Sequence, residues 1–531
     1  MNEVDYLVIG AGPAGLQLGY YLQRAGVSYR VLEKGPTAGD FFRKYPRHRK
    51  LISVNKVHTG YSDPERNLRF DWNSLLTDDH SLLLKHYTEE YFPSADALVE
   101  YLEEFQRRFV PNIDVNTEVV STSRNDDGTF TVEAKNGQKY HARAVILATG
   151  VSRPYVPRIT GIEHSENYVD VSVDPQDFVG QRVLVLGKGN SGFETADALI
   201  PTTSLLHVAS PTPVKFAWKT HFPGHLRAVN NNFLDTYQLK TQNAVLDAQV
   251  RKIEKTESGT LRVSFSYEHA LGEVEDIEYD RVIVCTGFKF DPSIFAEGCR
   301  PARVHADRFP EMTSEWESVN VPNLFYAGVI TQSRDYKKTN SAFIHGFRYN
   351  AKTLFHILRN KVEGRPLPYE VVRPDAVEFT RAALRRIRKS SALWQQFGFL
   401  CDAIVLGEDG EARYYEELPF HYVHESDIGR SKHYYTISLE FGHCHDDPFN
   451  VPRDPDPETA DQSFFLHPVV RRYSRGKAVR RIHLLENLFG EWEDEELHVR
   501  PLFEFFQSQM VMQEPPKLET MPPRMADYPA E

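Results

Sequence analysis

Two glycine turns in the sequence have the residue types and spacing that can bind a nucleotide pyrophosphate. Each has the pattern Gly-x-Gly-x-x-Gly and stands between an apolar, strand-like run and a helix-like run. The first glycine of such a turn permits the tight bend, the second lets the backbone approach the phosphates, and the third lets helix and strand pack closely. The following helix presents free backbone N–H groups and the positive end of its dipole to the anion. The predicted contacts are Gly10, Gly12, Pro13, Ala14 and Gly15 in the first turn, and Gly187, Gly189, Asn190, Ser191 and Gly192 in the second.

The charges downstream of the two turns differ. Glu33, with Lys34 beside it, ends the strand after the first turn, where a carboxylate can accept hydrogen bonds from ribose hydroxyls. No acid follows the corresponding strand after the second turn, and Lys215 comes a few residues later instead. Such a site does not repel a 2′-phosphate, and a lysine can pair with one. The sequence therefore predicts FAD at the first turn, and NADPH rather than NADH at the second.

The elements around these turns predict an α/β chain with two Rossmann-like dinucleotide-binding domains and an additional C-terminal α+β region. Two further strand-like runs end in Thr149–Gly150 and Thr286–Gly287, where the chain would cross between the domains, and we expect these four residues to contact the cofactors. The expected domains are a first part of the FAD-binding domain over 1–165, an NAD(P)H-binding domain over 166–280 with an insertion at 211–245, a second part of the FAD-binding domain over 281–365, and a C-terminal extension over 366–531.

The bulk composition excludes several classes of protein. The 531 residues are 41% hydrophobic and 26% charged, with a net charge of −12. An acidic chain without long single-sign charge blocks argues against a nucleic-acid partner, and no apolar run is long enough for a membrane span. Four scattered cysteines fit a reducing compartment better than a disulfide framework. The first strand follows Met1 almost directly and the sequence ends in DYPAE, so we expect no signal peptide, no retention signal and a cytoplasmic location.

Taken together, GAGPAG, Glu33, the ATG at 148–150, GKGNSG and CTGF resemble the flavin-containing monooxygenase group of FAD/NAD(P) enzymes. Longer strings, such as RKYPRHRKLISVNK and LRAVNNNFLDTYQLK, resemble the FAD-dependent oxidoreductase domain-containing proteins of the animal endoplasmic reticulum. This resemblance implies the fold and both cofactors. It also implies that Gly328 lets FAD approach, and that a helix from about Ser341 directs its N-terminus at the flavin. Because the expected signal and retention tail are missing, a role in the endoplasmic reticulum is not implied.

The resemblance also implies a chemistry. In that class NADPH reduces FAD, O₂ adds at the flavin C4a atom, and one oxygen passes to a nucleophile or a carbonyl. Disulfide reduction is disfavoured, because no two cysteines form a Cys-x-x-Cys pair. Asn55 matches the approximate position of the active-site asparagine of flavin-containing monooxygenases and is the candidate catalytic hydrogen-bond donor. The alternative is that Asn55 caps a turn.

The insertion at 211–245 is the expected substrate-facing element, because it interrupts the nucleotide domain with polar residues set among aromatic ones. The same residues could instead satisfy the backbone of a long loop. No metal site is expected, because the run GHCHDD at 442–447 has no partner motif at zinc spacing. The candidate substrate contacts are His225, Arg227, Asn230 and Asn231.

The leading hypothesis is an NADPH- and O₂-dependent flavin monooxygenase that hydroxylates the nitrogen of a small amine or amino acid. Baeyer–Villiger-type oxygenation and S-oxygenation are alternatives on the same fold. A flavin-binding interaction protein with little oxygenase activity is an alternative of another class. The C-terminal extension could complete the substrate pocket, contact a second subunit in a homodimer, or do both.

Overall fold

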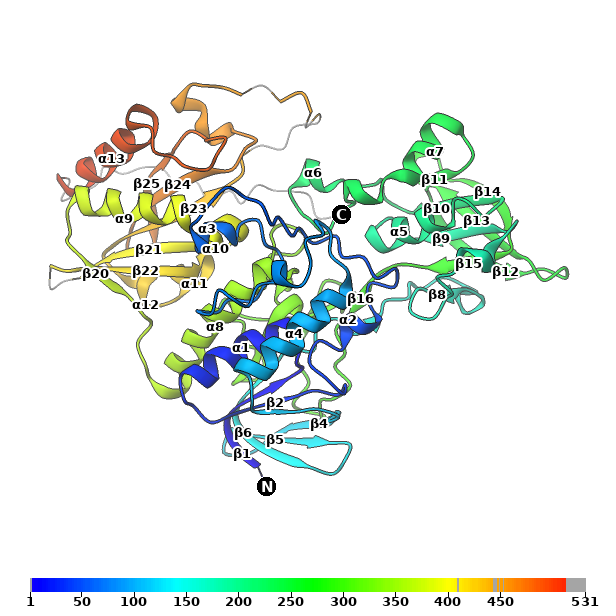
Figure 1. Ribbon diagram of the computed structural model, residues 1–531, viewed down its shortest axis with the longest axis horizontal. Coiled ribbons are helices and arrows are strands. Elements are labelled where there is room, and N and C mark those ends of the chain that lie inside the picture. The colour runs from blue at the N-terminus through cyan, green and yellow to red at the C-terminus, as the bar shows by residue number, and fades with distance from the viewer. Residues whose placement is uncertain (1, 408–409, 443–446, 448, 452, 512–531) are drawn as a thin grey trace.

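The computed structural model describes residues 2–407, 410–442, 447, 449–451 and 453–511. It contains three principal β-sheets, each with helices packed against it (Figure 1). The second sheet and the C-terminal sheet lie at opposite ends of the long axis, and the first sheet lies between them with helices α1, α4 and α8 (Figure 1). Among the described residues, no helix is long and apolar enough to span a bilayer.

The first sheet has a parallel core, because buried apolar strands are connected through helices that cover their faces. Its order is β3-β2-β1-β6-β5-β4, and β19 pairs in parallel with the carboxyl-end half of β6. Strands β4, β5 and β6 pair antiparallel at one edge of this sheet. The elements are β1 (Asn2–Ile9), α1 (Pro13–Arg24), β2 (Tyr29–Leu32), α4 (Ala95–Phe109), β3 (Ile113–Asp114), β4 (Val119–Arg124), β5 (Phe130–Ala134), β6 (Lys139–Leu147), β19 (Leu324–Tyr326) and α8 (Ile344–Glu363).

The second sheet is parallel throughout, in the order β11-β10-β9-β15-β8. Its strand β15 shows that the boundary expected at residue 281 is misplaced, because this buried strand pairs with β9 and not with the first sheet. The expected insertion likewise ends inside the sheet, where residue 244 begins β11. The elements are β8 (Glu166–Asn167), β9 (Arg182–Leu186), α5 (Asn190–Leu199), β10 (Leu205–Ser210), α6 (Ala217–Thr220), α7 (Asn232–Lys240), β11 (Ala244–Asp247) and β15 (Arg281–Val284), with an antiparallel sheet of β12 (Gln249–Lys255), β13 (Leu261–Tyr267) and β14 (Glu273–Tyr279).

The C-terminal region is an α+β unit, as expected. Its six antiparallel strands have the order β20-β22-β21-β23-β24-β25, and α9 and α13 pack together over buried residues of this sheet. Its elements are β20 (Glu370–Val372), α9 (Ala376–Lys389), α10 (Ser391–Gln395), β21 (Leu400–Leu406), β22 (Ala412–Pro419), α11 (Phe420–Glu425), α12 (Asp427–Arg430), β23 (His433–Glu440), β24 (His467–Ser474), β25 (Lys477–His483) and α13 (Arg500–Val511). The remaining short elements are α2 (Phe41–Lys44), α3 (Pro64–Asn67), β7 (Arg153–Pro154), β16 (Phe288–Lys289), β17 (Arg303–Val304) and β18 (Phe309–Pro310).

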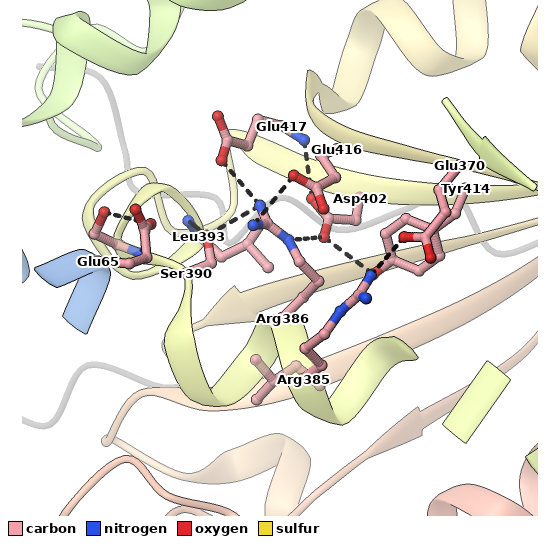
Figure 2. Close-up of polar contacts among 12 residues, drawn as sticks. Glu65, Glu370, Arg385, Arg386, Ser390, Leu393, Asp402, Tyr414, Glu416 and Glu417 are labelled. Carbon is pink, nitrogen blue, oxygen red and sulfur yellow. Dashed lines mark hydrogen bonds and ion pairs between the residues drawn. The ribbon is translucent and has the colours of Figure 1, made fainter. Parts of the chain in front are cut away.

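A buried network of charges joins the C-terminal unit to helix α8. The Arg386 guanidinium of α9 pairs with Asp402 of β21 at 2.8 Å and with Glu417 of β22 at 2.9 Å (Figure 2). Lys352 of α8 pairs with the second carboxylate oxygen of Glu417 at 3.0 Å. Burial alone would raise the pKa of Glu417, but Lys352 and Arg386 hold it at about 2. We call the first sheet with its helices α1, α4 and α8 the first unit, and the second sheet with its helices the second unit. One carboxylate, that of Glu417, therefore connects helix α8 of the first unit to the C-terminal sheet.

Candidate functional site

The first glycine turn has the geometry that its pattern predicts. Gly10 has φ of 105°, and α1 begins at Pro13. A Cβ added to Gly15 would lie 1.9 Å from the carbonyl oxygen of Gly10, so only glycine fits there. A Cβ added to Gly12 would meet nothing within 4 Å. Space for a pyrophosphate therefore lies in front of Gly12, at the N-terminus of the helix.

Two distant chain segments come to this turn, as the sequence predicts. A Cβ on Gly10 would lie 3.2 Å from the Thr149 nitrogen, at the carboxyl end of β6. Gly328 has φ of 79°, and a Cβ on it would lie 2.7 Å from Cβ of Ala14 in α1. A Cβ on Gly150 would lie 3.5 Å from a side-chain carbon of Val329, the residue after Gly328. The structure thus brings the three predicted contact regions together.

Glu33 lies buried at the end of β2 beside this turn. Its two carboxylate oxygens accept hydrogen bonds from the backbone N–H groups of Ala11 and Gly35, each at 2.8 Å. Lys34 is exposed. Because each carboxylate oxygen can accept a further hydrogen bond, Glu33 is held in place and can still bind ribose hydroxyls. This acid and the open space at Gly12 fit the adenosine and pyrophosphate of FAD.

The second turn repeats the construction. Gly187 has φ of 118°, and a Cβ on Gly192 would lie 2.1 Å from the carbonyl oxygen of Gly187. A Cβ on Gly189 would meet nothing within 4 Å. Gly287, with φ of 84°, follows β15 beside this turn, and the Thr286 hydroxyl donates to the carbonyl of Tyr155. The second turn thus also fits a nucleotide pyrophosphate.

Asn190, the first residue of α5, anchors the insertion to the second turn. Its amide nitrogen donates to the carbonyl of His225 at 2.8 Å and to that of Gly224 at 3.2 Å. Its amide oxygen accepts from the Arg227 backbone N–H at 3.0 Å and from the Asn230 side chain at 3.3 Å. The side chain predicted to contact a nucleotide therefore holds the loop that contains the predicted substrate residues. Ser191 follows it in α5.

Three of the four predicted substrate residues, His225, Arg227 and Asn230, meet at Asn190, but their side chains have different partners. The His225 ring lies 2.7 Å from the Thr220 hydroxyl, and burial, assisted by Lys337 and Lys215, lowers the His225 pKa to about 4. Asn230 is buried against Asn190, whereas Asn231 precedes α7 without capping it. Lys215 itself is exposed, beyond the end of β10.

Arg227 connects the insertion to the first unit. Its guanidinium donates to the Ile52 carbonyl at 2.8 Å and lies 5.2 Å above the Trp72 ring. Another part of the insertion contacts the C-terminal unit, because the His221 ring stacks on Phe441 at 3.8 Å. The insertion therefore lies at the junction of all three units.

Asn55 is buried, and its amide nitrogen donates to the carbonyls of Thr88 at 3.0 Å and Glu90 at 3.2 Å. Both amide N–H groups thus have main-chain acceptors. These contacts favour the alternative in which Asn55 holds a turn, and its role as a catalytic donor stays a prediction.

Arg47 is a positioning residue that the sequence did not reveal. Its guanidinium donates to the carbonyls of Tyr168, Val169 and Val171, at 2.8 Å for Val171. These carbonyls follow β8 of the second sheet, whereas Arg47 belongs to the loop after α2. The run PRHRK indicated only positive charge. Arg47 and Arg227 together fix the first unit against the second.

Glu194 of α5 is a second group that the sequence did not reveal. Burial and the neighbouring Asp197 raise its pKa to about 7. The folded protein therefore keeps a proton that the unfolded chain releases between about pH 4.5 and 7, so this contribution to stability is complete below pH 4.5 and is lost as the pH rises through 7. We expect Glu194→Gln to raise the free energy of unfolding at pH 8 by about 1–3 kcal/mol, with partial exposure reducing the full effect.

Urea unfolding at pH 5 and pH 8 measures this difference. Glu257→Gln, at an exposed turn of the same unit, is the control and should change little at either pH. An equal effect of Glu194→Gln at both pH values would contradict the assignment.

The cysteines of the described residues are not placed for disulfide chemistry. Cys285, Cys299 and Cys401 are buried, and burial raises the pKa of Cys285 to about 12. Such thiols are poor nucleophiles at neutral pH. Cys444 and most of the GHCHDD run lie outside the described residues. Within the described part of the chain, no cluster of three His, Cys, Asp or Glu side chains could hold a metal ion.

Residues 7–328 match the family described as pyridine nucleotide-disulphide oxidoreductase. The chain belongs to this family. A mouse protein, FAD-dependent oxidoreductase domain-containing protein 2, is 35% identical over 95% of this chain and 84% of its own length. Senecionine N-oxygenase of Tyria jacobaeae is 26% identical over 61% of this chain and 66% of its own length. The structure of a flavin-containing monooxygenase from Stenotrophomonas maltophilia superposes with a TM-score of 0.51 and 21% identity, and covers 68% of this chain and 99% of that chain.

Membership in the pyridine nucleotide-disulphide oxidoreductase family implies a flavin-dependent oxidoreductase that binds FAD and a nicotinamide nucleotide. The expected fold of two dinucleotide-binding domains is confirmed. The family match ends at residue 328, whereas the likeness to the mouse protein covers 95% of the chain. Most of the C-terminal unit is therefore shared with that relative and not with the family as a whole.

Proposed function

We propose that this protein is an NADPH- and O₂-dependent flavin monooxygenase that oxygenates the nitrogen of a small amine or amino acid. The observation that carries the proposal is a pair of open nucleotide turns on two adjoining units, in a sequence without a Cys-x-x-Cys pair. A reduced flavin with no such pair beside it passes its electrons elsewhere, and O₂ is the acceptor used by the class that the chain resembles.

FAD, when bound, supplies electron transfer and oxygen activation. The chain holds the two nucleotides and excludes water. Gly12 and Gly189 admit the two pyrophosphates, and Glu33 is placed for the ribose of FAD. Arg47 keeps the units in one relative position, as hydride transfer between the cofactors requires. The neutral His225 and the packed insertion exclude water from the junction of the units.

The preference for nitrogen is supported by the Tyria jacobaeae relative, which is named an N-oxygenase. Sulfur and carbonyl oxygenation remain alternatives on the same fold. The mouse relative, which shares the C-terminal unit, supports the remaining alternative of a flavin-binding interaction protein.

Stopped-flow mixing of the NADPH-reduced, FAD-loaded protein with O₂ tests the proposal. We expect a transient absorption spectrum that differs from the spectra of both oxidised and reduced flavin, and its decay should quicken when a substrate is added. Direct return to oxidised flavin with NADP⁺ present, and no product from amines, amino acids, thioethers or ketones, would instead support the interaction protein.

A further inference from the structure

Backbone hydrogen bonds place the two nucleotide turns in register with each other. The Gly10 N–H donates to the carbonyl of Leu32 at 2.7 Å, and the Gly187 N–H donates to the carbonyl of Ala209 at 2.8 Å. Leu32 and Ala209 are therefore equivalent positions on their strands. It follows that Ser210 is the counterpart of Glu33, and that Lys188 is the counterpart of Ala11.

The ribose-binding position of the second turn is thus occupied by a lysine ammonium. The Lys188 Nζ atom donates to the carbonyl of Ser210 at 3.3 Å and to that of Thr212 at 3.1 Å, and it forms an ion pair with Asp247. Only 4% of the Lys188 side chain is exposed. At the first turn, the equivalent Ala11 offers only a backbone N–H to Glu33.

Asp247, the acid in the Lys188 ion pair, lies at the end of β11 and not on β10. Ser210 is opposite Asp247 in the parallel register of β10 and β11, so the ends of these strands bring the two residues together. The Asp247 side chain is 39% exposed, whereas the lysine beneath it is covered. An incoming anion therefore reaches the ammonium only when the exposed Asp247 carboxylate moves aside.

We propose that Lys188 selects the 2′-phosphate of NADPH, and that Asp247 holds the ammonium at the end of β10 until the phosphate replaces it. This assignment rests on the NADPH preference in the proposed function. A phosphate is a stronger partner for the ammonium than a carboxylate, because it carries more charge and more acceptor oxygens. NADH has only a ribose hydroxyl at this point, a neutral acceptor that gains much less from the Lys188 ammonium than a phosphate does.

The test uses the FAD-loaded full chain with Lys188→Met, with Lys215→Met for the lysine that the sequence pattern favoured, and with Lys240→Met, an exposed lysine of α7, as the matched control. Binding of adenosine 2′,5′-bisphosphate and of AMP is measured by calorimetry, and flavin reduction by NADPH and NADH is measured without oxygen. We expect Lys188→Met to weaken the bisphosphate and NADPH by about tenfold or more, with AMP and NADH changed less than about twofold. Lys188→Arg should keep the preference for NADPH, and Asp247→Asn should strengthen it.

Three results would overturn the assignment. Equal losses for both nucleotides in Lys188→Met would make the lysine purely structural. A selective loss in Lys215→Met alone would move the phosphate contact to that exposed lysine. A wild-type preference for NADH that Asp247→Asn removes would make Asp247 a ribose ligand. None of these measurements involves oxygenation, so a protein without monooxygenase activity gives an equally clear result.

Discussion

The substitution Gly189→Val is expected to leave FAD bound and to reduce the kcat/KM of flavin reduction by NADPH about 100-fold or more. Apart from its chain neighbours, a Cβ added at this position meets nothing within 4 Å, and Gly189 has φ of −88°, which any residue adopts. The valine would instead fill the space in front of α5, where the pyrophosphate must approach the backbone. A 100-fold loss in kcat/KM corresponds to about 3 kcal/mol of transition-state stabilisation.

Anaerobic stopped-flow reduction and the flavin content of the purified protein measure this effect. Gly12→Val is the reciprocal control at the first turn. It leaves the second turn unchanged, and we expect the purified protein to lose its bound FAD. Gly192→Ala should behave differently from both, since its Cβ would strike the carbonyl of Gly187 at 2.1 Å and destabilise the turn. Reduction of Gly189→Val at the wild-type rate would show that the second turn is not the nicotinamide nucleotide site.

The substitution Arg386→Met is expected to lower the free energy of unfolding by about 3–5 kcal/mol. It would leave Asp402 and Glu417 without their shared cation, and the side chains of these acids are 0% and 4% exposed. Removing one partner of a buried ion pair is costly because the remaining charge stays desolvated. Urea unfolding followed by tryptophan fluorescence measures the loss.

Arg385→Met is the matched control, one residue away on the same helix (Figure 2). Arg385 pairs with Glu370 at 2.7 Å, but both side chains are about half exposed, so its removal should cost less than about 1 kcal/mol. Equal stability of the two variants would show that the buried network does not hold the C-terminal unit in place.

Local patterns in the sequence predict the parts of the site that depend on backbone shape. Gly15 and Gly192 had to be glycines for helix and strand to pack, so the two turns were identifiable without the fold. The resemblance to flavin-containing monooxygenases, and not a local pattern, placed the start of α8 within three residues, at Ser341 against the observed Ile344. The α+β character of the C-terminal region was also evident from local signals. The order of its antiparallel strands was not, because it depends on pairings between distant residues.

Contacts of side chains with residues far away in the sequence could not be predicted from the sequence alone. The sequence has no acid directly after β10. Asp247, at the end of β11, is brought beside Ser210 by the pairing of β10 with β11, and the sequence alone does not show this pairing. Arg47 contacts carbonyls more than 120 residues away, and no local pattern encodes such contacts. Asn55 and Asn190 were expected to face ligands, yet both hold the main chain, since a buried amide must satisfy its donors and acceptors.

Because Asn190 holds the insertion, a nucleotide at the second turn and a ligand at the insertion would have linked affinities. Asn190 begins α5, the helix proposed to bind the pyrophosphate of the nicotinamide nucleotide, and the loop that it holds lies where all three units meet. A ligand that displaces this loop must also disturb the start of α5. Linkage then makes the effect reciprocal: the factor by which the nucleotide changes the affinity for that ligand equals the factor by which the ligand changes the affinity for the nucleotide. For a ligand that binds by displacing this loop, Asn190 would couple the two binding equilibria, and removing its side chain should make them independent.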